Sequence, residues 1–541
     1  MRPVSERDST TSNTYSTRLK NMRPPSALLN GLVEPLNKGL DSTCTKYDIS
    51  NLTELDYSKF DSIPKELLEE RSFSGQMIRT NLLRGSTIIF FCAGYPGKRF
   101  IYEQAHKRGV KAIIIDNHDS WSRELLECGT ISGFVGIDMS RPVEEVLEAA
   151  LLGIRNLGVK VDGVCTFVEL SVSIAARLAR ALGLPGPDPD CVEAARDKSV
   201  TRSVMKEAGL PNVKNILINS EKDLPAAAAY IGFPAVLKPV SGAASLGVQK
   251  VSSENELLKV YRAVSRTLSG LIISAGALER RKDYTDESGK KLLCGNGTVE
   301  VNASCVINIT VIMEEYLDGF EVDVDMLLSD GVCRYAKVID NGPTYEPYFA
   351  ETWASVPSLL PPGRVEELEA LAIASVQALG FANGVYHVEL KYSSRGPRLI
   401  EVNARMGGGP TRMIHKLVSG IDLVLEQFFI SVGIPSRPLF SVTPLVHVAY
   451  AFINARKSGS VQCIDFMKRH EKQKNVVWVL PYVKPFEQVV GPEDGHPTWL
   501  GDVVVQHADG HEALRIVKKI EDTIATEFTD KSMKPLLFPN L

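Results

Sequence analysis

The sequence predicts an α/β protein organised around a parallel β-sheet. From Ser86 onward, short apolar runs typical of buried strands alternate with longer stretches whose apolar residues recur at helical spacing. This alternation indicates strands joined by helical crossovers, which give a parallel sheet. With 541 residues, the chain is long enough for roughly three or four domains with ample buried core.

The composition argues against several classes of protein. Lys and Arg number 61 and Asp and Glu number 65, so the formal charge of -4 predicts neither nucleic acid nor an acidic membrane as a main partner. The nine cysteines form no C-x-x-C pair and no close Cys/His set, which disfavours zinc and a disulfide framework and favours a reducing compartment. No apolar run approaches the length of a membrane helix, so we expect a soluble cytoplasmic protein.

The N-terminal tail carries little that could form a core. Eight of its first twenty residues are Ser or Thr, and we expect residues 1–40 to be disordered. Its arginines and hydroxyls weakly resemble an organelle transit peptide, but Glu6 and Asp8 count against targeting.

The elements of the first domain follow in order. We expect strands at residues 86–94, 110–116, 133–138 and 162–169, and helices at 99–108, 143–154 and 171–183. The turn AGYPGKR after the first strand could cradle a phosphate, but a G-x-x-G has little specificity and a simple tight turn is favoured.

The next segment combines a helix, a strand and a loop of small residues. Residues 191–209 predict a helix, residues 233–240 predict a strand, and the loop SGAASLGV follows. Small residues let backbone N–H groups approach phosphate oxygens, and Lys238 on the strand can add a point charge. A hairpin turn with a solvated lysine is the alternative, since the stretch lacks the P-loop pattern.

Two acidic stretches follow. Residues 279–291 hold nine charges in thirteen positions and predict an exposed, mobile insertion. Residues 311–328 predict a strand that continues through its whole length and places Glu321, Asp323 and Asp325 on one face.

The runs GVYHVELKY and PRLIEVNARM, joined by SSRG, predict a hairpin with a five-residue connection. In that hairpin Glu389 lies across from Glu401, whose face also carries Asn403 and Arg405. Opposed like charges repel, so a divalent cation between the two acids would explain them; a solvated edge strand is the alternative. We expect His387 on the opposite face, as a packed histidine.

These motifs together resemble the ATP-grasp superfamily, over about residues 84–435. The order is Lys198, then Lys238 with its loop, then the acids from Glu314 to Glu321, and then the hairpin acids. Within the superfamily, TFVELSVSIAARLARALGLPGP and EVNARMGGG-x-x-R are most similar to the carboxylate-amine ligases that make dipeptides, which include carnosine synthase and bacterial L-amino acid ligases.

The resemblance implies an ATP-grasp fold with a defined order of domains. A partly disordered extension (1–83) would precede a parallel α/β domain (84–190), a two-lobed nucleotide clamp (191–435, with the exposed insertion at about 276–303) and a C-terminal α+β domain (436–541). The last region reads as strands at 476–483 and 501–508 and a helix at 512–528.

The resemblance also implies roles for individual residues. The ATP contacts would come from Lys198, Lys238, Ser241, Ser245, Gly247, Glu314, Glu315, Tyr316, Leu317 and Glu321. Both lysines would meet phosphates, Glu314 would accept from the adenine amino group, and Glu321 would hold the ribose. Glu389, Glu401 and Asn403 match magnesium ligands, while Arg405 and Lys238 would be catalytic.

Substrate recognition is assigned to Arg412, Gly408, Gly409, Glu351 and Trp353. Arg412 would pair with a carboxylate, and the glycines either offer N–H groups or form a flexible turn. Several bacterial members have Gly-His where this chain has Trp353-Ala354, which leaves the substrate open; Trp353 filling core volume is the alternative.

The implied activity is the ATP-dependent condensation of a carboxylate with an amine through an acyl phosphate. The implied cofactors are ATP and two Mg²⁺ ions, for which Mn²⁺ can substitute, and the loop at 241–247 would be the lid. The partners would be small-molecule acids and amines, with a homodimer expected at most. A purine-biosynthetic or carboxylase-type enzyme and a non-catalytic nucleotide-binding module are the alternatives.

Overall fold

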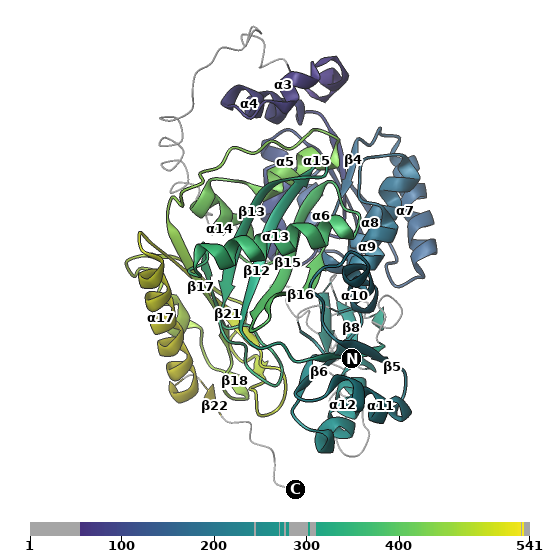
Figure 1. The fold of residues 1–541 in the computed structure, drawn as a ribbon. Coiled ribbons are helices and arrows are strands. Elements are labelled where there is room, and N and C mark those ends of the chain that lie inside the picture. The colour runs from purple at the N-terminus through teal and green to yellow at the C-terminus, as the bar shows by residue number, and fades with distance from the viewer. Residues whose placement is uncertain are drawn as a thin grey trace, which may run out of the picture. The chain divides into compact units, whose positions relative to one another are not determined.

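The computed structural model describes residues 55–242, 245–269, 271–274, 277–280, 301–302, 310–531 and 533–534 (Figure 1). All of them belong to one unit, Tyr47–Leu541. The predicted disordered tail and the transit-like segment lie outside the described residues, as do the middle of the charged insertion and part of the small-residue loop. Within the described ranges, no helix is long and apolar enough to cross a membrane.

The predicted parallel sheet is present in the first domain. It contains β1 (Thr87–Phe91), β2 (Lys111–Asn117), β3 (Gly133–Ile137) and β4 (Gly163–Cys165), in the order β3-β2-β1-β4. Its helices are α5 (Arg99–Lys107), α6 (Arg123–Glu127), α7 (Val143–Leu157) and α8 (Val172–Leu182). The short turn η4 (Pro96–Lys98) precedes α5, and η5 (Glu169–Ser171) precedes α8. Every residue of β1 is buried, as expected for a parallel strand covered on both faces.

A helical extension precedes this domain. It consists of η3 (Tyr57–Ser62), α3 (Lys65–Glu69) and α4 (Phe73–Leu82). Leu82 and Leu83 are fully buried in the same apolar cluster as Phe90 and Phe428. The extension is therefore part of the core of the folded chain.

The small lobe of the clamp is an antiparallel sheet in the order β5-β11-β6-β7. Its strands are β5 (Asn215–Ile218), β6 (Ala235–Pro239), β7 (Gln249–Val251) and β11 (Val311–Glu315), and its helices are η6 (Glu221–Asp223), α11 (Leu224–Ile231) and α12 (Glu254–Ser269). A separate three-stranded sheet joins β10 (Val301–Asn302), β8 (Leu271–Ser274) and β9 (Ala277–Arg280). The two ends of the predicted insertion thus lie in strands.

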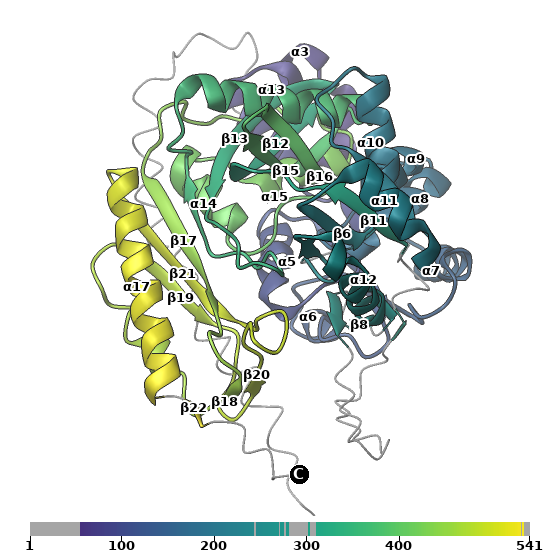
Figure 2. The same cartoon turned by 60° about the horizontal axis from the view of Figure 1, so that its bottom comes forward.

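The large lobe is an eight-stranded sheet that continues into the C-terminal region (Figure 2). Its order is β16 (Gly396–Asn403), β15 (Gly384–Ser393), β12 (Phe320–Ser329), β13 (Val332–Asn341), β14 (Trp353–Val356), β17 (His447–Asn454), β21 (Trp499–His507) and β19 (Val476–Pro481). Residues of α13 (Pro362–Ala378) form a core with the first four strands, and α17 (Gly510–Lys531) covers β17 and β21.

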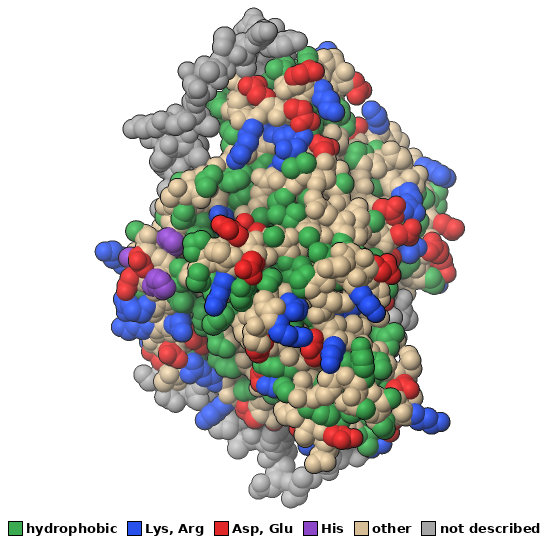
Figure 3. Space-filling view, in the orientation of Figure 1, with side chains coloured by type: hydrophobic (Ala, Val, Ile, Leu, Met, Phe, Trp, Pro, Cys, Tyr) green, Lys and Arg blue, Asp and Glu red, His purple; other side chains and the backbone are tan. Residues whose placement is uncertain are grey.

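The remaining elements are short and lie mainly in the C-terminal half. They are α14 (Thr411–Ser419), α15 (Leu423–Ser431), α16 (Asp465–Lys468), β18 (Gly459–Val461), β20 (Gln488–Val489) and β22 (Met533–Lys534). Acidic and basic side chains are interspersed over the face shown in Figure 3.

The prediction of one continuing strand over residues 311–328 was wrong. The segment forms two strands, β11 in the small-lobe sheet and β12 in the eight-stranded sheet. The break is at Gly319, whose φ is +85° and where a Cβ would lie 2.0 Å from the carbonyl oxygen of Tyr392. Only glycine fits at this position. Because β11 and β12 lie in different sheets, the short link between them connects the two lobes.

The predicted helix at 191–209 is divided in two. Its parts are α9 (Pro189–Arg196) and α10 (Lys198–Glu207), separated by Asp197, whose side chain accepts a hydrogen bond from the backbone N–H of Val200. Asp197 therefore acts as the N-cap of α10. Lys198 is the first residue of the second helix.

The predicted hairpin is confirmed, with Glu389 directly across from Glu401. The predicted five-residue connection was wrong, because only Ser394 and Arg395 connect the strands. A regular ladder from this turn would place Ile400 opposite Glu389, but Leu399 pairs with Leu390 and Glu401 pairs with Glu389. Ile400 is therefore a β-bulge residue.

We predict that Arg79→Ala lowers stability without changing nucleotide affinity. The fully buried Arg79 donates to the carbonyl oxygens of Leu68, Glu70 and Arg437, each at 2.8 Å. Unpaired buried acceptors should reduce the free energy of unfolding by about 3 kcal/mol, which a lower thermal midpoint would reveal. Arg123→Ala, at an exposed arginine that also donates to a carbonyl, is the control. Equal midpoints for both variants would contradict the assignment.

Candidate functional site

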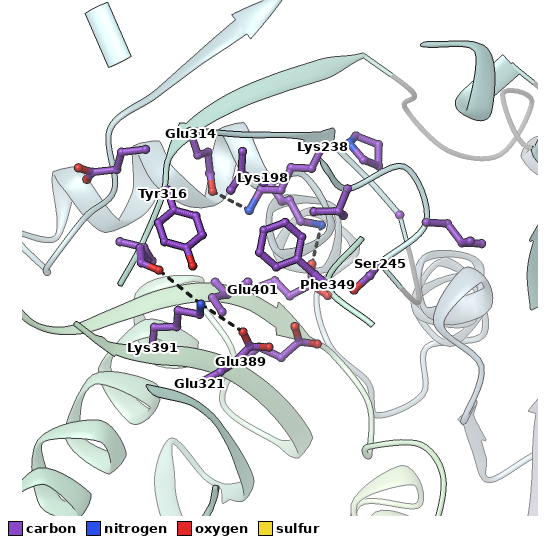
Figure 4. A pocket seen from close by; sticks show the side chains of 18 of the residues that line it. Lys198, Lys238, Ser245, Glu314, Tyr316, Glu321, Phe349, Glu389, Lys391 and Glu401 are labelled. Carbon is purple, nitrogen blue, oxygen red and sulfur yellow. Dashed lines mark hydrogen bonds and ion pairs between the residues drawn. The ribbon is translucent and has the colours of Figure 1, made fainter. Parts of the chain in front are cut away.

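A cleft between the two lobes contains most of the predicted site residues (Figure 4). The small lobe contributes β6 and β11, and the large lobe contributes β15 and β16. The lining residues are Lys198, Arg202, Val236, Lys238, Pro239, Gly242, Ser245, Leu246, Val248, Glu314, Glu315, Tyr316, Leu317, Glu321, Phe349, Glu351, Glu389, Lys391, Ile400 and Glu401.

Two lysines and Glu314 are buried charged residues that line the cleft. Lys198 Nζ lies 2.5 Å from Glu401 Oε2, and Lys238 Nζ lies 2.6 Å from Glu314 Oε2. Burial opposes the ionisation of Glu314, but Arg202 and Lys238 outweigh it and hold its pKa at about 2. Both carboxylate oxygens of Glu314 already accept from cations, and its predicted contact with adenine stays a prediction.

The link between the lobes forms the edge of the cleft. Lys391 Nζ donates to the carbonyl oxygen of Leu317 at 3.4 Å, lies 3.6 Å from Glu321 Oε2, and is 5.5 Å from the ring centre of Tyr316. The Tyr316 hydroxyl donates to Glu346. Tyr316, Leu317 and Glu321, which are predicted to contact the adenine and ribose of ATP, thus lie together at this edge of the cleft.

The polar stripe of β16 is present and close to Glu389. Asn403 Nδ2 donates to Glu389 Oε1 at 3.2 Å, and Arg405 Nη2 donates to Asn403 Oδ1 at 3.3 Å. Burial and the neighbouring Glu401 raise the pKa of Glu389. Burial acts in the same direction on Glu401, but Lys198 outweighs it and holds the pKa of Glu401 at about 2.

The donor set fits Mg²⁺ bound together with nucleotide phosphates. Among the residues that the structure describes, no three His, Cys, Asp or Glu side chains are grouped to hold a metal ion. Mg²⁺ needs fewer protein ligands, because it is usually bound by one or two carboxylates plus substrate phosphates. Glu389, Glu401 and the Asn403 amide supply such a set, and Lys198 alone leaves the paired acids with excess negative charge.

The N-terminal domain contacts the end of the β16 stripe through Glu169, and neither Glu169 nor the predicted catalytic Arg405 is among the residues that line the cleft. Glu169 Oε2 lies 2.8 Å from Arg405 Nε, and Arg405 Nη1 donates to the carbonyl oxygen of Met406. These contacts hold the guanidinium at the end of the stripe. Lys98 from the AGYPGKR turn donates to the carbonyl oxygen of Phe167, two residues before Glu169.

His387 lies on the same strand face as Glu389, so its predicted placement on the opposite face was wrong. Residues two apart on a strand share a face. Its Nδ1 lies 2.8 Å from Asp325 Oδ1, and His415 Nε2 lies 2.6 Å from Asp325 Oδ2. A Cβ on Gly407 would come within 2.9 Å of His387 Nδ1, which explains the first glycine of the GGG run.

The predicted substrate residues are dispersed. Arg412 Nε and Nη2 donate to Asp422 at 2.8 and 2.6 Å, while Gly408 is exposed and Gly409 has a φ of +54°. Glu351 lines the cleft. Trp353 instead packs on the apolar cluster beneath α17, with Lys518 Nζ 4.9 Å from its ring centre, which favours the core-filling alternative.

The structure describes only part of the predicted phosphate loop. Ser245, with a φ of +54°, lines the cleft. The Ser241 hydroxyl donates to the carbonyl oxygen of Arg196, and Gly247, with a φ of +79°, lies where a Cβ would meet Leu268. The intervening residues lie outside the described ranges, so the lid stays a prediction.

Sequence reasoning missed Arg202, Lys391, Phe349 and Glu169. Arg202 is one helical turn after Lys198, and Lys391 is two residues after Glu389 on the same strand face. Helical and strand periodicity around the predicted residues would have found these two. Phe349 comes from a turn and Glu169 from the short η5, and their contacts depend on the tertiary fold.

Comparisons with known proteins agree with this geometry. Residues 102–186 match the family of the ATP-grasp N-terminal domain, and residues 294–412 match that of the ATP-grasp domain. The two matched regions are ATP-grasp domains, and the chain has the ATP-grasp fold. A crystal structure of L-amino acid ligase from Bacillus licheniformis has the same fold, with a TM-score of 0.66 at 21% identity over 81% of this chain and 98% of that one.

Two kinds of curated ligase are similar in sequence. Carnosine synthase 1 of Gallus gallus is 32% identical over 371 residues, which cover 66% of this chain and 37% of that protein. Alanine-anticapsin ligase of Bacillus subtilis strain 168 is 26% identical over 299 residues, which cover 53% of this chain and 57% of that protein. The chain therefore aligns with well under half of the carnosine synthase.

We predict that the effect of Glu314→Gln depends on pH. The pKa of Glu314 is lowered from 4.5 to about 2 in the folded state, so its ionic contribution is complete above pH 4.5 and disappears as the pH falls toward 2. Removing the charge leaves two buried cations and should cost about 3–5 kcal/mol at pH 7. Denaturant unfolding of both proteins at pH 7 and pH 3 should show a smaller difference at pH 3.

Glu315→Gln is the matched control, because its partner Arg395 is half exposed. The pH-dependent part of the difference should be smaller for this variant. A cost of Glu314→Gln that is the same at both pH values would contradict the ion-pair assignment.

Proposed function

We propose that this protein is an ATP-dependent carboxylate-amine ligase that joins an acid to an amine, at least one of them an amino acid. The proposal rests mainly on the pair Glu389 and Glu401. These residues lie opposite each other on two strands, in a cleft that also contains Lys198 and Lys238. Such a cleft suits the polyphosphate of ATP with a divalent cation. The names of the related ligases favour an amide or dipeptide product.

The reaction would proceed in two steps. An oxygen of the acid attacks the terminal phosphorus of ATP, forming an acyl phosphate and releasing ADP. The amine nitrogen then attacks the acyl carbon, the C–O bond to phosphate breaks, and an amide and phosphate leave with one proton. Mg²⁺, when bound, neutralises phosphate charge and holds the phosphates in line.

The residues of the chain have separate tasks in this scheme. Lys198 and Lys238 hold phosphate oxygens, and Glu389, Glu401 and Asn403 would hold Mg²⁺. Arg405, fixed by Glu169 and Asn403, offers donors to the charge that develops on the transferred phosphoryl group. The loop at 241–247 would exclude water, since an acyl phosphate hydrolyses easily.

The test of the function is ADP release with a panel of acids and amines. Incubation with Mg-ATP and pairs of α- and ω-amino acids should give ADP and phosphate only when both partners are present, with one amide per ADP by mass spectrometry. ADP release with bicarbonate or formate as the acid would favour the carboxylase or purine-biosynthetic alternative. Tight ATP binding without turnover on any pair would favour the non-catalytic module.

Some finer predictions accompany this proposal. They are two metal ions with Mn²⁺ as a substitute, a cytoplasmic location and a homodimer at most. Metal counting on the nucleotide-bound protein and sedimentation of the purified chain address the first and the last of them.

We predict that Glu401→Gln and Arg405→Lys fail in different ways. Glu401→Gln removes a ligand charge and should weaken Mg²⁺-dependent ATP binding by at least about 10-fold. Arg405→Lys keeps the charge but loses the planar fork, so ATP binds normally while kcat falls about 10²-fold. Arg398→Lys, on the same strand outside the cleft, is the control. If both site variants turned over at the wild-type rate, the site assignment would be contradicted, and the polar side chains of β16 would only be a solvated strand face.

We predict that Arg412→Ala raises KM for an amino-acid substrate while ATP affinity is unchanged, because it removes a carboxylate partner and no phosphate contact. Lys416→Ala is the matched control, since Lys416 Nζ also lies 3.3 Å from Asp422. Equal effects of the two variants on KM would show that Arg412 only neutralises Asp422.

A further inference from the structure

Helix α10 presents two cations to the cleft, one helical turn apart. Lys198 and Arg202 are four residues apart, so they lie on one face of the helix. Lys198 contacts Glu401 in the large lobe. Arg202 is only 2% exposed, and the proposed function gives it no task.

Arg202 is bonded to both lobes at once. In the small lobe, its Nε donates to Glu314 Oε1 at 2.8 Å and its Nη2 donates to Glu314 Oε2 at 3.2 Å. In the large lobe, Nη2 also donates to the carbonyl oxygen of Ile400 at 2.8 Å. One rigid guanidinium thus connects β11, which carries the nucleotide-facing acid, to β16.

The contact on β16 is at the bulge that sets the register of the acid pair. Ile400 has no partner in the ladder, and its extra residue places Glu401 opposite Glu389. The bulge also keeps Leu399 and Val402 in the core while Ile400 and Glu401 line the cleft. A bond to the Ile400 carbonyl therefore holds the backbone next to a proposed metal ligand.

One nitrogen of Arg202 is available for a further acceptor. Nη1 is buried and has no hydrogen-bond partner within the described part of the chain. Arg202 lines the cleft, and a buried unsatisfied donor is costly. Bound nucleotide can supply the missing acceptor.

We propose that Arg202 is a positioning residue that couples nucleotide binding in the small lobe to the register of the metal ligands in the large lobe. The inference rests on the proposed function. It requires that nucleotide and Mg²⁺ bind cooperatively and that this cooperativity passes through the guanidinium. A merely structural ion pair would stabilise the fold and leave the cooperativity intact.

The test measures the coupling and not the activity. The Kd of the non-hydrolysable ATP analogue AMPPNP is measured by calorimetry with and without MgCl₂, in the full chain. The ratio of the two values is the coupling factor. We expect Arg202→Lys, which keeps the charge but loses the fork, to reduce this ratio by about 10-fold, while the magnesium-free Kd changes only a few-fold.

Arg196→Lys is the matched control. Arg196 is a largely buried arginine on the neighbouring helix that does not line the cleft, so its substitution should leave the ratio unchanged. If Arg202→Lys does not fold, Glu314→Gln cuts the same connection from the small-lobe side and should lower the ratio too.

The outcomes separate the inference from the proposed function. A ratio that Arg202→Lys or its substitute Glu314→Gln leaves at the wild-type value overturns the coupling role, even if both affinities fall together. Absence of magnesium-dependent nucleotide binding in the wild-type protein would instead overturn the proposed function. A reduced ratio in the variant and a normal one in Arg196→Lys supports the inference.

Discussion

Two carboxylates held face to face are the constraint around which the rest of the site is arranged. Glu389 and Glu401 lie opposite each other on neighbouring strands, where like charges repel. Lys198 pairs with Glu401, while burial and the neighbouring Glu401 raise the pKa of Glu389. A divalent cation with phosphate ligands would supply positive charge between the two acids, so their repulsion would favour the binding of Mg-ATP.

The surrounding elements bring three parts of the chain to this pair. Helix α10 supplies Lys198 and the bridging Arg202, the small lobe supplies Lys238 and Glu314, and the N-terminal domain reaches Arg405 through Glu169. The eight-stranded sheet holds the pair on its β15–β16 edge and continues through β14 into the C-terminal strands. Helix α10 and the small lobe contribute charge to the cleft, and the N-terminal domain positions Arg405 beside it.

Much of the fold and the core of the site could be predicted from the sequence, because they depend on local periodicity. The apolar runs of the first domain have the length of strands. The pairing of Glu389 with Glu401 was predicted from a five-residue connection, and it occurs with the shorter turn because Ile400 forms a bulge. Alternation continues on both sides of Gly319, which hid the change of sheet, although Asp-Gly is a turn signal. The apolar pair Leu399-Ile400 gave no sign of a bulge.

Other features depend on contacts far apart in the sequence. The ring of Trp353 lies beneath a helix that begins more than 150 residues later, so its place in the core could not be read from its neighbours. The bonds from Arg202 to Glu314 and Ile400 span 112 and 198 residues. The placement of His387, in contrast, was an error of strand parity that the sequence alone would have corrected.

The most direct measurement is the anomalous diffraction of Mn²⁺ in a crystal of the protein grown with ADP. The cross-strand pair predicts a manganese peak in contact with carboxylate oxygens of both Glu389 and Glu401 and with the terminal phosphate of ADP. Manganese bound elsewhere, with Lys198 still paired to Glu401 and no peak beside Glu389 in a crystal that holds ADP in the cleft, would contradict it.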